Sequence, residues 1–333
     1  MRFLAQELGV SPATVSIVLN NSPLASSISE QTKNRVWEAI EKFDYRPNFL
    51  ARCLSNRRSY TIAVVVPEVS DGYSAHLLNA IEESFIRERY FYIVASHRSS
   101  PEMLDACVSR LRDRAVEGFI FVNTPLEHAV GLPAVHIAGH KSLPNVTNIV
   151  LDNYAAADLA VKHLTDLGHR HIAMFKGQPG SADTEDRYKG VCQAFERYGV
   201  KVDADLTIQL QGTKVERRSP THEEGYEYAK RLLSREKRFT ALVAFNDISA
   251  IGAIRAFHDA GLRVPGDVSV VGFDDIEEAA YTVPGLTTIR QPLREMGELA
   301  AVTVLDRIAG KRVAKTIGVN PQLIVRGTTQ AAK

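Results

Sequence analysis

The hydrophobic pattern of this chain changes near residue 60. Before that point, apolar residues recur every three or four positions, which is typical of short helices. After it, short apolar runs alternate with longer amphipathic segments, which is typical of alternating strands and helices. We therefore expect a small all-α domain followed by a larger α/β body.

Two short helices are predicted at the start of the chain. The first ends at Gly9, because glycine readily adopts the left-handed conformation that follows a helix. Ser11 and Pro12 then give a start signal, since serine caps free backbone amides and proline fits the first helical position. The second helix has an apolar face made of Val15, Val18 and Leu19. This is the helix-turn-helix pattern, although an ordinary helical hairpin gives a similar one.

A third helix is predicted after Ser29, another capping residue. We expect its apolar residues to close a three-helix core: Val36, Trp37, Ile40 and Phe43. The pattern then breaks at Asp-Tyr-Arg-Pro-Asn (44–48), before a short segment that ends in the basic pair Arg57 and Arg58. A small helical core followed by a basic segment favours nucleic-acid binding.

The body shows a regular alternation of predicted strands and helices. The strands are 61–66, 91–95, 118–122, 134–138, 171–175, 206–210, 241–245 and 268–272. The helices are 73–87, 102–112, 154–167, 187–198, 222–233, 248–260 and 292–308. Such alternation predicts parallel sheets covered by helices on both faces. The body is long for one core, so we expect two doubly wound subdomains.

Polar residues follow the ends of several predicted strands. Because doubly wound sheets bind ligands at the carboxyl ends of their strands, we expect these residues to line a cleft between the subdomains. They are Asp71, Tyr73, Asn123, Arg187, Asn246, Asp274 and Gln291. For Asp247 and Asp275, capping of the following helix is the favoured interpretation. Asn246 could also cap the helix that starts at 248.

Composition and charge narrow the class of protein. The 333 residues include 40 Lys and Arg, 39 Asp and Glu and three Cys, which argues against a disordered chain or a disulfide scaffold. Residues 1–59 carry a net charge of +3 and the rest −2, so a basic head precedes a mildly acidic body. No apolar run approaches the ~20 residues of a membrane span, and no signal peptide is recognised. We expect a cytoplasmic protein.

Signatures of enzymes and metal sites are not found. The sequence has no GxGxxG after a strand, no P-loop, no GxSxG and no HExxH. The spacing of His163, His169 and His171 fits a helix entering a strand and not a metal site. Asp274 and Asp275 are adjacent and diverge, so they do not form a catalytic acid pair. We expect no enzymatic activity, no metal and no cofactor.

Ordered motifs along the chain resemble the lactose-repressor (LacI) family. The first are GVSPATVSIVLNNSP, ISEQTKNRV and DYRPNFLARCLSNRRSYTIAVVVPE. Those of the body are LGHRHIAMFKG, DRYKG, ALVAFNDISAIGAIRAF, DVSVVGFDD and LTTIRQP. The motifs cover essentially the whole chain at the family's spacing. The resemblance implies a sequence-specific transcriptional regulator, a repressor, with a helix-turn-helix headpiece and a periplasmic-binding-protein-like core.

The resemblance also implies individual DNA contacts. Four positions grip phosphates, which set the register without reading sequence: Ser11, Thr14, Ser16 and Asn20. Three positions face base edges: Pro12, Ala13 and Ile17. Three belong to a hinge helix, in which the last is an apolar wedge in the minor groove: Asn48, Ala51 and Leu54. Relatives usually carry arginine at the position of Ile17, so we expect only apolar base contact there, for example with a thymine methyl.

Domain boundaries and assembly follow from the same resemblance. Residues 1–47 form the headpiece, 48–59 the hinge helix and linker, and 60–333 the effector-binding and dimerisation core. The N-subdomain comprises about 60–157 and 289–320, and the C-subdomain about 158–288 and 321–330, with crossings near 158, 288 and 321. The sequence shows no heptad tail after its last strand, which predicts a homodimer on a near-palindromic operator.

The effector is expected to be a sugar or a related polar metabolite. In the family, an aromatic near Tyr73 stacks on the ligand, and Arg187, Asn246 and Asp274 bind its hydroxyls; Arg beside Asp suits a polyol. Three departures, at 72–74, at 139–140 and in the long polar segment 211–224, argue against a simple hexose. An oligosaccharide, a nucleoside-like ligand and no small effector are alternatives. For the whole protein, the alternative is a periplasmic-type binding protein without operator recognition.

Overall fold

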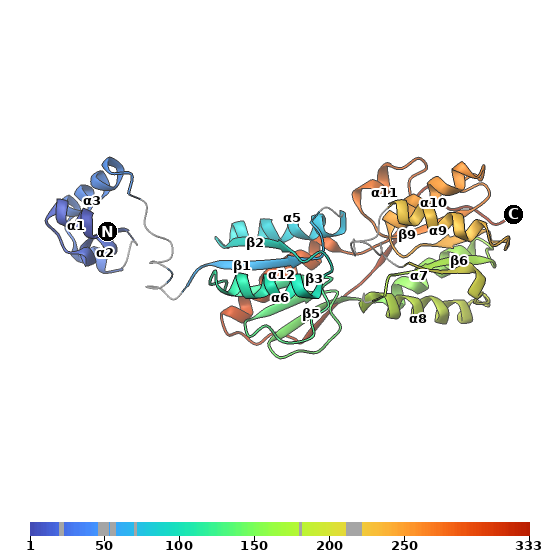
Figure 1. Cartoon of the computed structure of the whole chain (residues 1–333), viewed down its shortest axis with the longest axis horizontal. Coiled ribbons are helices and arrows are strands. Elements are labelled where there is room, and N and C mark those ends of the chain that lie inside the picture. Colours follow the sequence, from blue (N-terminus) through green and yellow to red (C-terminus); the bar gives the residue numbers. More distant parts are fainter. Residues whose placement is uncertain (20–22, 46–52, 54–57, 70–71, 180–181, 211–221) are drawn as a thin grey trace. The chain divides into compact units, whose positions relative to one another are not determined.

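The computed structural model describes residues 1–19, 23–45, 53, 58–69, 72–179, 182–210 and 222–333 (Figure 1). Contacts between residues divide the chain into two units, Met1–Ser59 and Tyr60–Lys333.

The first unit is helical. It contains α1 (Arg2–Leu8), α2 (Pro12–Leu19), the short 3-10 helix η1 (Pro23–Ser27) and α3 (Glu30–Lys42). Gly9 ends α1 with a left-handed φ of 65°. Ser29 begins α3, because its side chain accepts a hydrogen bond from the backbone amide of Thr32. The three helices therefore begin or end at the residues that the sequence predicts.

The core of this unit is smaller than the sequence suggests. Leu4, Val15 and Val36 are completely buried and join the three helices. Trp37 and Phe43 were expected in this core, but 47% and 38% of their surfaces are exposed. Consecutive residues of a helix point about 100° apart, so Trp37 turns outward when Val36 points inward. Phe43 follows the end of α3.

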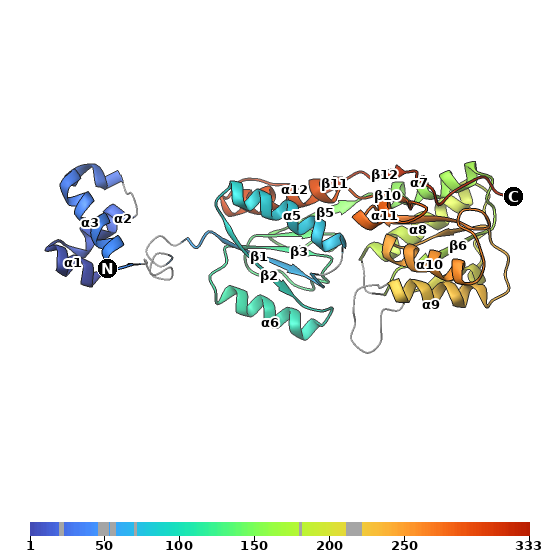
Figure 2. The ribbon, with the colours of Figure 1, turned by 90° about the horizontal axis from the view of Figure 1, so that it is seen from above.

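The second unit contains two six-stranded sheets among its described residues (Figure 2). The first sheet has the order β11 (Thr316–Val319), β5 (Val146–Leu151), β4 (Ala134–Ile137), β3 (Gly118–Val122), β1 (Thr61–Val66) and β2 (Phe91–Ser96). The second has the order β12 (Gln322–Ile324), β10 (Thr287–Arg290), β9 (Ser269–Asp274), β8 (Ala241–Val243), β6 (Ile172–Lys176) and β7 (Thr207–Gln209). Neighbouring strands are parallel, except that β12 is antiparallel to β10.

Helices cover both faces of each sheet, as Figure 2 shows. In the first half, α5 (Gly72–Arg87) and α12 (Leu293–Ile308) lie on one face, and α6 (Pro101–Arg112) lies on the other. In the second half, α7 (Asn153–Asp166) and α8 (Ala182–Arg197) lie opposite α9 (His222–Leu233) and α10 (Asp247–Asp259). Two short helices, η2 (Ala204–Leu206) and α11 (Glu277–Tyr281), lie in connections. The predicted class, α/β with two doubly wound sheets, is confirmed.

Burial on both faces explains the continuous apolar runs. In β1, Ile62 and Val64 pack into the core under α5 and α12, whereas Ala63 and Val65 pack into the core under α6. Successive residues of a strand point to opposite faces, so both sets must be apolar. The strand β5 was not predicted, because Thr147 and Asn148 interrupt its apolar run. Both are buried and hydrogen-bonded.

The chain passes between the two halves three times. It leaves the first sheet after β5, returns after β10 and leaves again after β11. The first passage lies at Asp152, earlier than the expected 158, because α7 already packs on the second half. The second passage lies after Arg290, later than the expected 288, because β10 pairs with β9 along its whole length.

At Gly252, α9 and α10 pack too closely to leave room for a side chain. A Cβ on Gly252 would overlap the carbonyl oxygen of His222 and lie 2.8 Å from the backbone nitrogen of Tyr226. Because the helices would have to separate, we expect Gly252→Ala to lower the free energy of unfolding by about 1–3 kcal/mol. Urea unfolding followed by circular dichroism measures this. Gly318→Ala is the control, since its Cβ has no neighbour within 4 Å, and an equal loss there would contradict the explanation.

Candidate functional site

The N-terminal part of α2 forms an exposed surface. Ser11, Pro12 and Ala13 are exposed, whereas Thr14, Ser16 and Ile17 are half-buried. The hydroxyl of Ser11 accepts a hydrogen bond of 3.0 Å from the amide of Thr14, so Ser11 caps the helix. Its Oγ also lies 2.9 Å from Oγ1 of Thr14. The apolar residues Val15 and Val18 face the core and fix which side of α2 points outward.

This surface can bind an anionic backbone and reach base edges. The first turn of α2 contains no acidic residue, and the positive end of the helix dipole lies there. Hydroxyl groups at a helix N-terminus are typical phosphate contacts. Ala13 and Ile17 are one turn apart and present methyl groups, which suit contact with thymine. Four other predicted contacts lie outside the described residues: Asn20, Asn48, Ala51 and Leu54.

Arg187 is the centre of a second cluster, in the larger unit. It extends from α8 and is buried, with 6% of its surface exposed. Its Nη1 donates to the carbonyl oxygen of Phe245 at 2.6 Å, and its Nε donates to Oδ1 of Asn153 at 3.1 Å. The guanidinium carbon lies 3.4 Å from the ring centre of Phe273 and 4.6 Å from that of Phe245. The guanidinium is therefore fixed by stacking and hydrogen bonds.

Asp274 and Gln291 form a polar pair beside Arg187. Asp274 ends β9 with a left-handed φ of 114°, a conformation that is uncommon for a residue with a side chain. Gln291 follows β10, and its Nε2 donates a hydrogen bond to Oδ1 of Asp274 at 2.7 Å. The charge of Asp274 and the hydroxyl of Tyr73 both act electrostatically on Arg187. Four residues predicted from strand ends therefore lie in one region. They supply one cation, one anion, one amide and one phenol.

The remaining predicted effector residues are placed differently. The Asn246 side chain accepts from the amide of Ser249 at 2.9 Å, in a capping box at the start of α10. Asn123 follows β3 with a φ of 43°, and its amide donates to Ile137. The contacts found among the described residues do not join Asn123 to Arg187. Asp71 lies outside the described residues.

Asp247 and Asp275 were expected to cap helices, but they instead bind residues of other strands and connections of the second half. Asp247 is completely buried and accepts from Oγ1 of Thr288 at 2.5 Å and from the amide of Ile276 at 3.0 Å. Burial and the nearby charge of Asp274 raise the pKa of Asp247. Asp275 binds two arginines, Arg290 at 2.7 Å and Arg326 at 2.6 Å. Strand ends that meet in one sheet explain both roles, which sequence neighbours alone do not reveal.

Three residues of the cluster were not predicted as site residues. Asn153 and Asp183 are both buried, and Nδ2 of Asn153 donates to Asp183 at 2.9 Å. Nε2 of His140 lies 2.8 Å from the same carboxylate. Asn153 follows β5 closely, so the rule of polar residues at strand ends would have found it if β5 had been recognised. His140 and Asp183 are 43 positions apart, and the sequence gives no sign of their contact.

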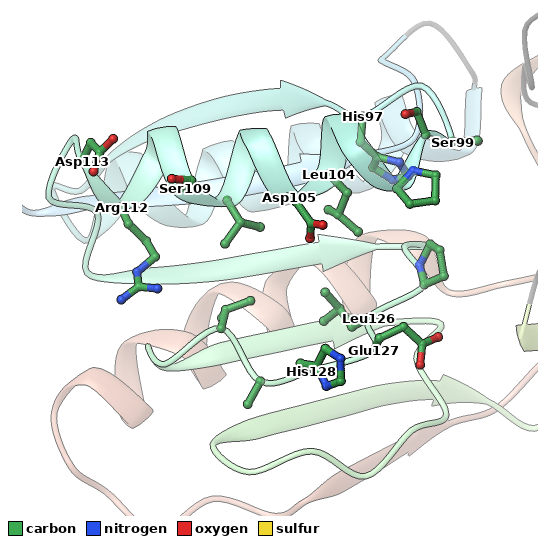
Figure 3. A pocket seen from close by; sticks show the side chains of 16 residues that line it. His97, Ser99, Leu104, Asp105, Ser109, Arg112, Asp113, Leu126, Glu127 and His128 are labelled. Atoms are coloured by element: carbon green, nitrogen blue, oxygen red, sulfur yellow. The ribbon is translucent and has the colours of Figure 1, made fainter.

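A separate groove of about 840 Å³ lies on the first half (Figure 3). Leu104, Asp105 and Ser109 point into it from α6, and Leu126 and His128 lie on the opposite side. The chain from 123 to 133 joins the parallel strands β3 and β4 without a helix, although such crossovers usually contain one. A short loop therefore stands where a helix would cover the sheet. The groove includes none of the predicted effector residues.

His163 and His169, which were considered as metal ligands, contact threonine hydroxyls. Nε2 of His163 lies 2.9 Å from Oγ1 of Thr329, and Nδ1 of His169 lies 2.8 Å from Oγ1 of Thr240. Across the described ranges, no group of three or more His, Cys, Asp or Glu is arranged to hold a metal ion. In the same part of the chain, no helix has the length and apolar character needed to cross a bilayer.

Two family descriptions match the chain. "Bacterial regulatory proteins, lacI family" matches residues 2–48, and "Periplasmic binding protein-like domain" matches residues 161–329. Among curated relatives, the HTH-type transcriptional regulator DegA of Bacillus subtilis is 34% identical over 98% of this chain and 96% of its own length. The HTH-type transcriptional repressor PurR of Erwinia tasmaniensis is 32% identical over 97% of this chain and 94% of its own.

Solved structures agree with these matches. The lac repressor dimer bound to operator and the anti-inducer ONPF has a TM-score of 0.85 and 27% identity, and each chain covers 98% of the other. The complex of the transcriptional regulator CelR with cellobiose has a TM-score of 0.72 and 26% identity, again with 98% of each chain covered. Both similarities include the helical unit and the α/β unit in a single chain.

Proposed function

Because this chain belongs to the lacI family of bacterial regulatory proteins, we propose that it represses transcription by binding a near-palindromic operator as a homodimer. It is a DNA-binding transcriptional regulator and not an enzyme. One observation carries the assignment: relatives named as regulators match both units along 97–98% of the chain. A ligand-binding protein without operator recognition is not favoured, since the helix-turn-helix unit itself matches the family.

The headpiece is proposed as residues 1–47, followed by a hinge helix and linker over 48–59. Ser11, Thr14, Ser16 and Asn20 contact phosphates, and Pro12, Ala13 and Ile17 face base edges. Asn48, Ala51 and Leu54 lie in the minor groove. Support comes from the exposed N-terminal surface of α2 and its lack of acidic residues in the first turn. A cytoplasmic location is proposed, because a bacterial DNA-binding regulator must reach the chromosome there.

A genomic pull-down tests operator recognition. Purified full-length protein is incubated with sheared genomic DNA, and the retained fragments are sequenced. We expect enrichment of a palindrome whose half-sites fit the two headpieces of a dimer. Retention of fragments without a shared sequence would contradict specific recognition.

Sedimentation of the free protein tests the assembly, and a stable tetramer would contradict the proposed dimer.

The effector is proposed to bind at the strand ends around Arg187. The core is proposed to comprise an N-subdomain of about 60–151 and 291–320 and a C-subdomain of about 153–290 and 321–330, following the passages at Asp152 and after Arg290. Arg187 and Asp274 are buried, oppositely charged groups, which suit a ligand with several hydroxyls. The similarity to a regulator in complex with cellobiose supports a sugar or a related polar metabolite. Asp71, Tyr73, Asn123, Asn246 and Gln291 complete the proposed site.

A ligand screen tests this site. Sugars, sugar phosphates and nucleosides are added singly to the full-length protein, and the melting temperature is measured. A ligand present at 100 times its Kd should stabilise the protein by about 2.7 kcal/mol. Asp274→Asn should weaken binding of any hit by about 10- to 100-fold, because a charge-assisted hydrogen bond is lost. A hit that Asp274→Asn binds equally well would place the ligand elsewhere, for example in the groove of Figure 3.

A further inference from the structure

His140 lies between the two halves of the core. It follows β4 of the first sheet, after a turn in which Ala138 has a left-handed φ of 60°. Gly139 lies directly over the ring of His136, since a Cβ there would overlap that ring. The side chain of His140 contacts Asp183 of α8, a helix that packs on the second half. A residue from one half thus contacts a helix of the other.

Both ring nitrogens of His140 face carboxylates of α8. Nε2 lies 2.8 Å from Oδ1 of Asp183, and Nδ1 lies 3.3 Å from Oδ2 of Asp186. A neutral imidazole has one N–H and one lone pair, so one nitrogen would oppose a carboxylate oxygen. Nε2 forms the hydrogen bond to Asp183, whereas Nδ1 and Asp186 are in ion-pair contact, and only the imidazolium presents a proton and a positive charge to both carboxylates. The geometry therefore fits the protonated form of the ring.

Asp183 is held in its ionised form. Burial alone would raise the pKa of Asp183, but the hydrogen bond from His140 and the charge of Arg187 lower it below its ordinary value. Nη2 of Arg187 lies 3.9 Å from Oδ2 of Asp183, and Nδ2 of Asn153 donates to the same carboxylate at 2.9 Å. Asp183 therefore offers a fixed negative charge to the imidazole.

The other charged groups around His140 do not cancel this attraction. Desolvation of the buried His136 lowers its pKa to about 4, so that ring is neutral near pH 7. Lys141, the next residue, pairs with Glu127 at 2.7 Å. The hydrogen bond to Asp183 raises the pKa of His140 above its ordinary value, although partial burial opposes the shift. Asp186 adds attraction in the same direction.

We propose that His140, Asp183 and Asp186 form a proton-dependent latch between the two halves of the core. The latch is closed when both nitrogens of His140 carry protons. Loss of one proton leaves a nitrogen lone pair against a carboxylate and favours separation of the halves. The proton thus acts as a second ligand of the core, and its site shares Asp183 with the cluster around Arg187.

The direction of the pH effect follows from the raised pKa. A group whose pKa is higher in the closed form contributes its full stabilisation below its ordinary pKa, here 6.5, and loses it as the pH rises through the raised value. Closure is therefore favoured in mildly acidic solution. A rise in pH through the raised pKa of His140 weakens it.

Titration of His140 in the full-length protein is the first test. Histidine labelled with ¹³C at Cε1 is observed by NMR, and His140→Gln identifies the resonance. We expect a midpoint above 6.5, which falls by more than about half a pH unit in Asp186→Asn because one partner charge is lost. Asp186 is one-third exposed, so this variant is chosen over the buried Asp183. His171→Gln is the control and should leave the midpoint unchanged.

Distance measurement between the halves is the second test. Fluorophores are attached at the exposed positions 113 and 201, and energy transfer is followed from about pH 5.5 to 9. We expect the distance to increase with the midpoint of His140 and to be independent of pH in His140→Gln. A midpoint at or below 6.5, or no effect of Asp186→Asn on it, would overturn the proposal. So would a raised midpoint without a matching change in distance.

Discussion

Replacing Arg187 by alanine is expected to lower the free energy of unfolding of the core by about 3–5 kcal/mol. Its guanidinium is buried between two aromatic rings and compensates the buried Asp183 and Asp274. Alanine removes the guanidinium charge beside both carboxylates, of which Asp183 keeps its contact with His140, and it takes away the Nη1 donor to the carbonyl of Phe245. Urea unfolding followed by far-UV circular dichroism measures the loss. Tryptophan fluorescence is unsuitable, because Trp37 in the helical unit is the only tryptophan.

Arg197 provides the matched control on the same helix. It pairs with Asp158 at 2.6 Å, but 62% of its side chain is exposed. Exposed ion pairs contribute little to stability, so Arg197→Ala should cost much less than Arg187→Ala. Equal losses would show that the buried cluster does not stabilise the core as we infer. Any effector found in the ligand screen should also fail to act on Arg187→Ala while acting normally on Arg197→Ala.

Introducing a negative charge on α2 is expected to weaken operator binding strongly. Ala13 is exposed in the first turn of α2, and Ala13→Glu would place a carboxylate where DNA phosphates or base edges approach. Juxtaposed like charges cost several kcal/mol at an interface, so we expect the affinity to fall by about 100-fold or more. Gel-shift titration of a sequence recovered from the genomic pull-down measures this at fixed salt concentration.

The control for this variant is an exposed alanine on a helix of the core. Ala280 in α11 meets this description, and Ala280→Glu changes the net charge by the same amount. It should leave operator affinity within a few-fold of the original. A similar loss for both variants would attribute the effect to overall charge and not to α2. Unchanged binding by Ala13→Glu would remove this face of α2 from the DNA interface.

Patterns within short segments were sufficient for the ends of helices in the helical unit, but not for its core. The cap at Ser29 and the stop at Gly9 act through neighbouring backbone groups, so the residues that create them lie close together in the sequence. Trp37 was misplaced because the pattern shows that a helix has an apolar face but not how wide that face is. In this unit the core ends at Val36 and Ile40, which leaves the larger ring outside.

The positions of strand ends predicted part of the proposed effector site for a physical reason. Parallel strands end at the same edge of a sheet, so residues far apart in sequence, such as Asp274 and Gln291, were expected to meet. The contacts of Arg187 with Asn153 and of His140 with Asp183 join different elements. They depend on how the elements pack, which local pattern does not specify. The partners of Asp247 and Asp275 could not be predicted for the same reason. Thr288 lies in β10 and Arg326 follows β12, both far away in the sequence.

The threefold passage of the chain between the sheets bears on how the protein folds during synthesis. Each sheet recruits an edge strand from late in the sequence: β11 at 316–319 for the first and β12 at 322–324 for the second. Neither half can complete its hydrogen-bonded sheet on the ribosome until translation has passed these residues. Among the described residues, the hydrophobic core of the helical unit is made by residues between 1 and 45, so it can form much earlier. A nascent chain would therefore carry a finished DNA-binding module before the core that controls it exists.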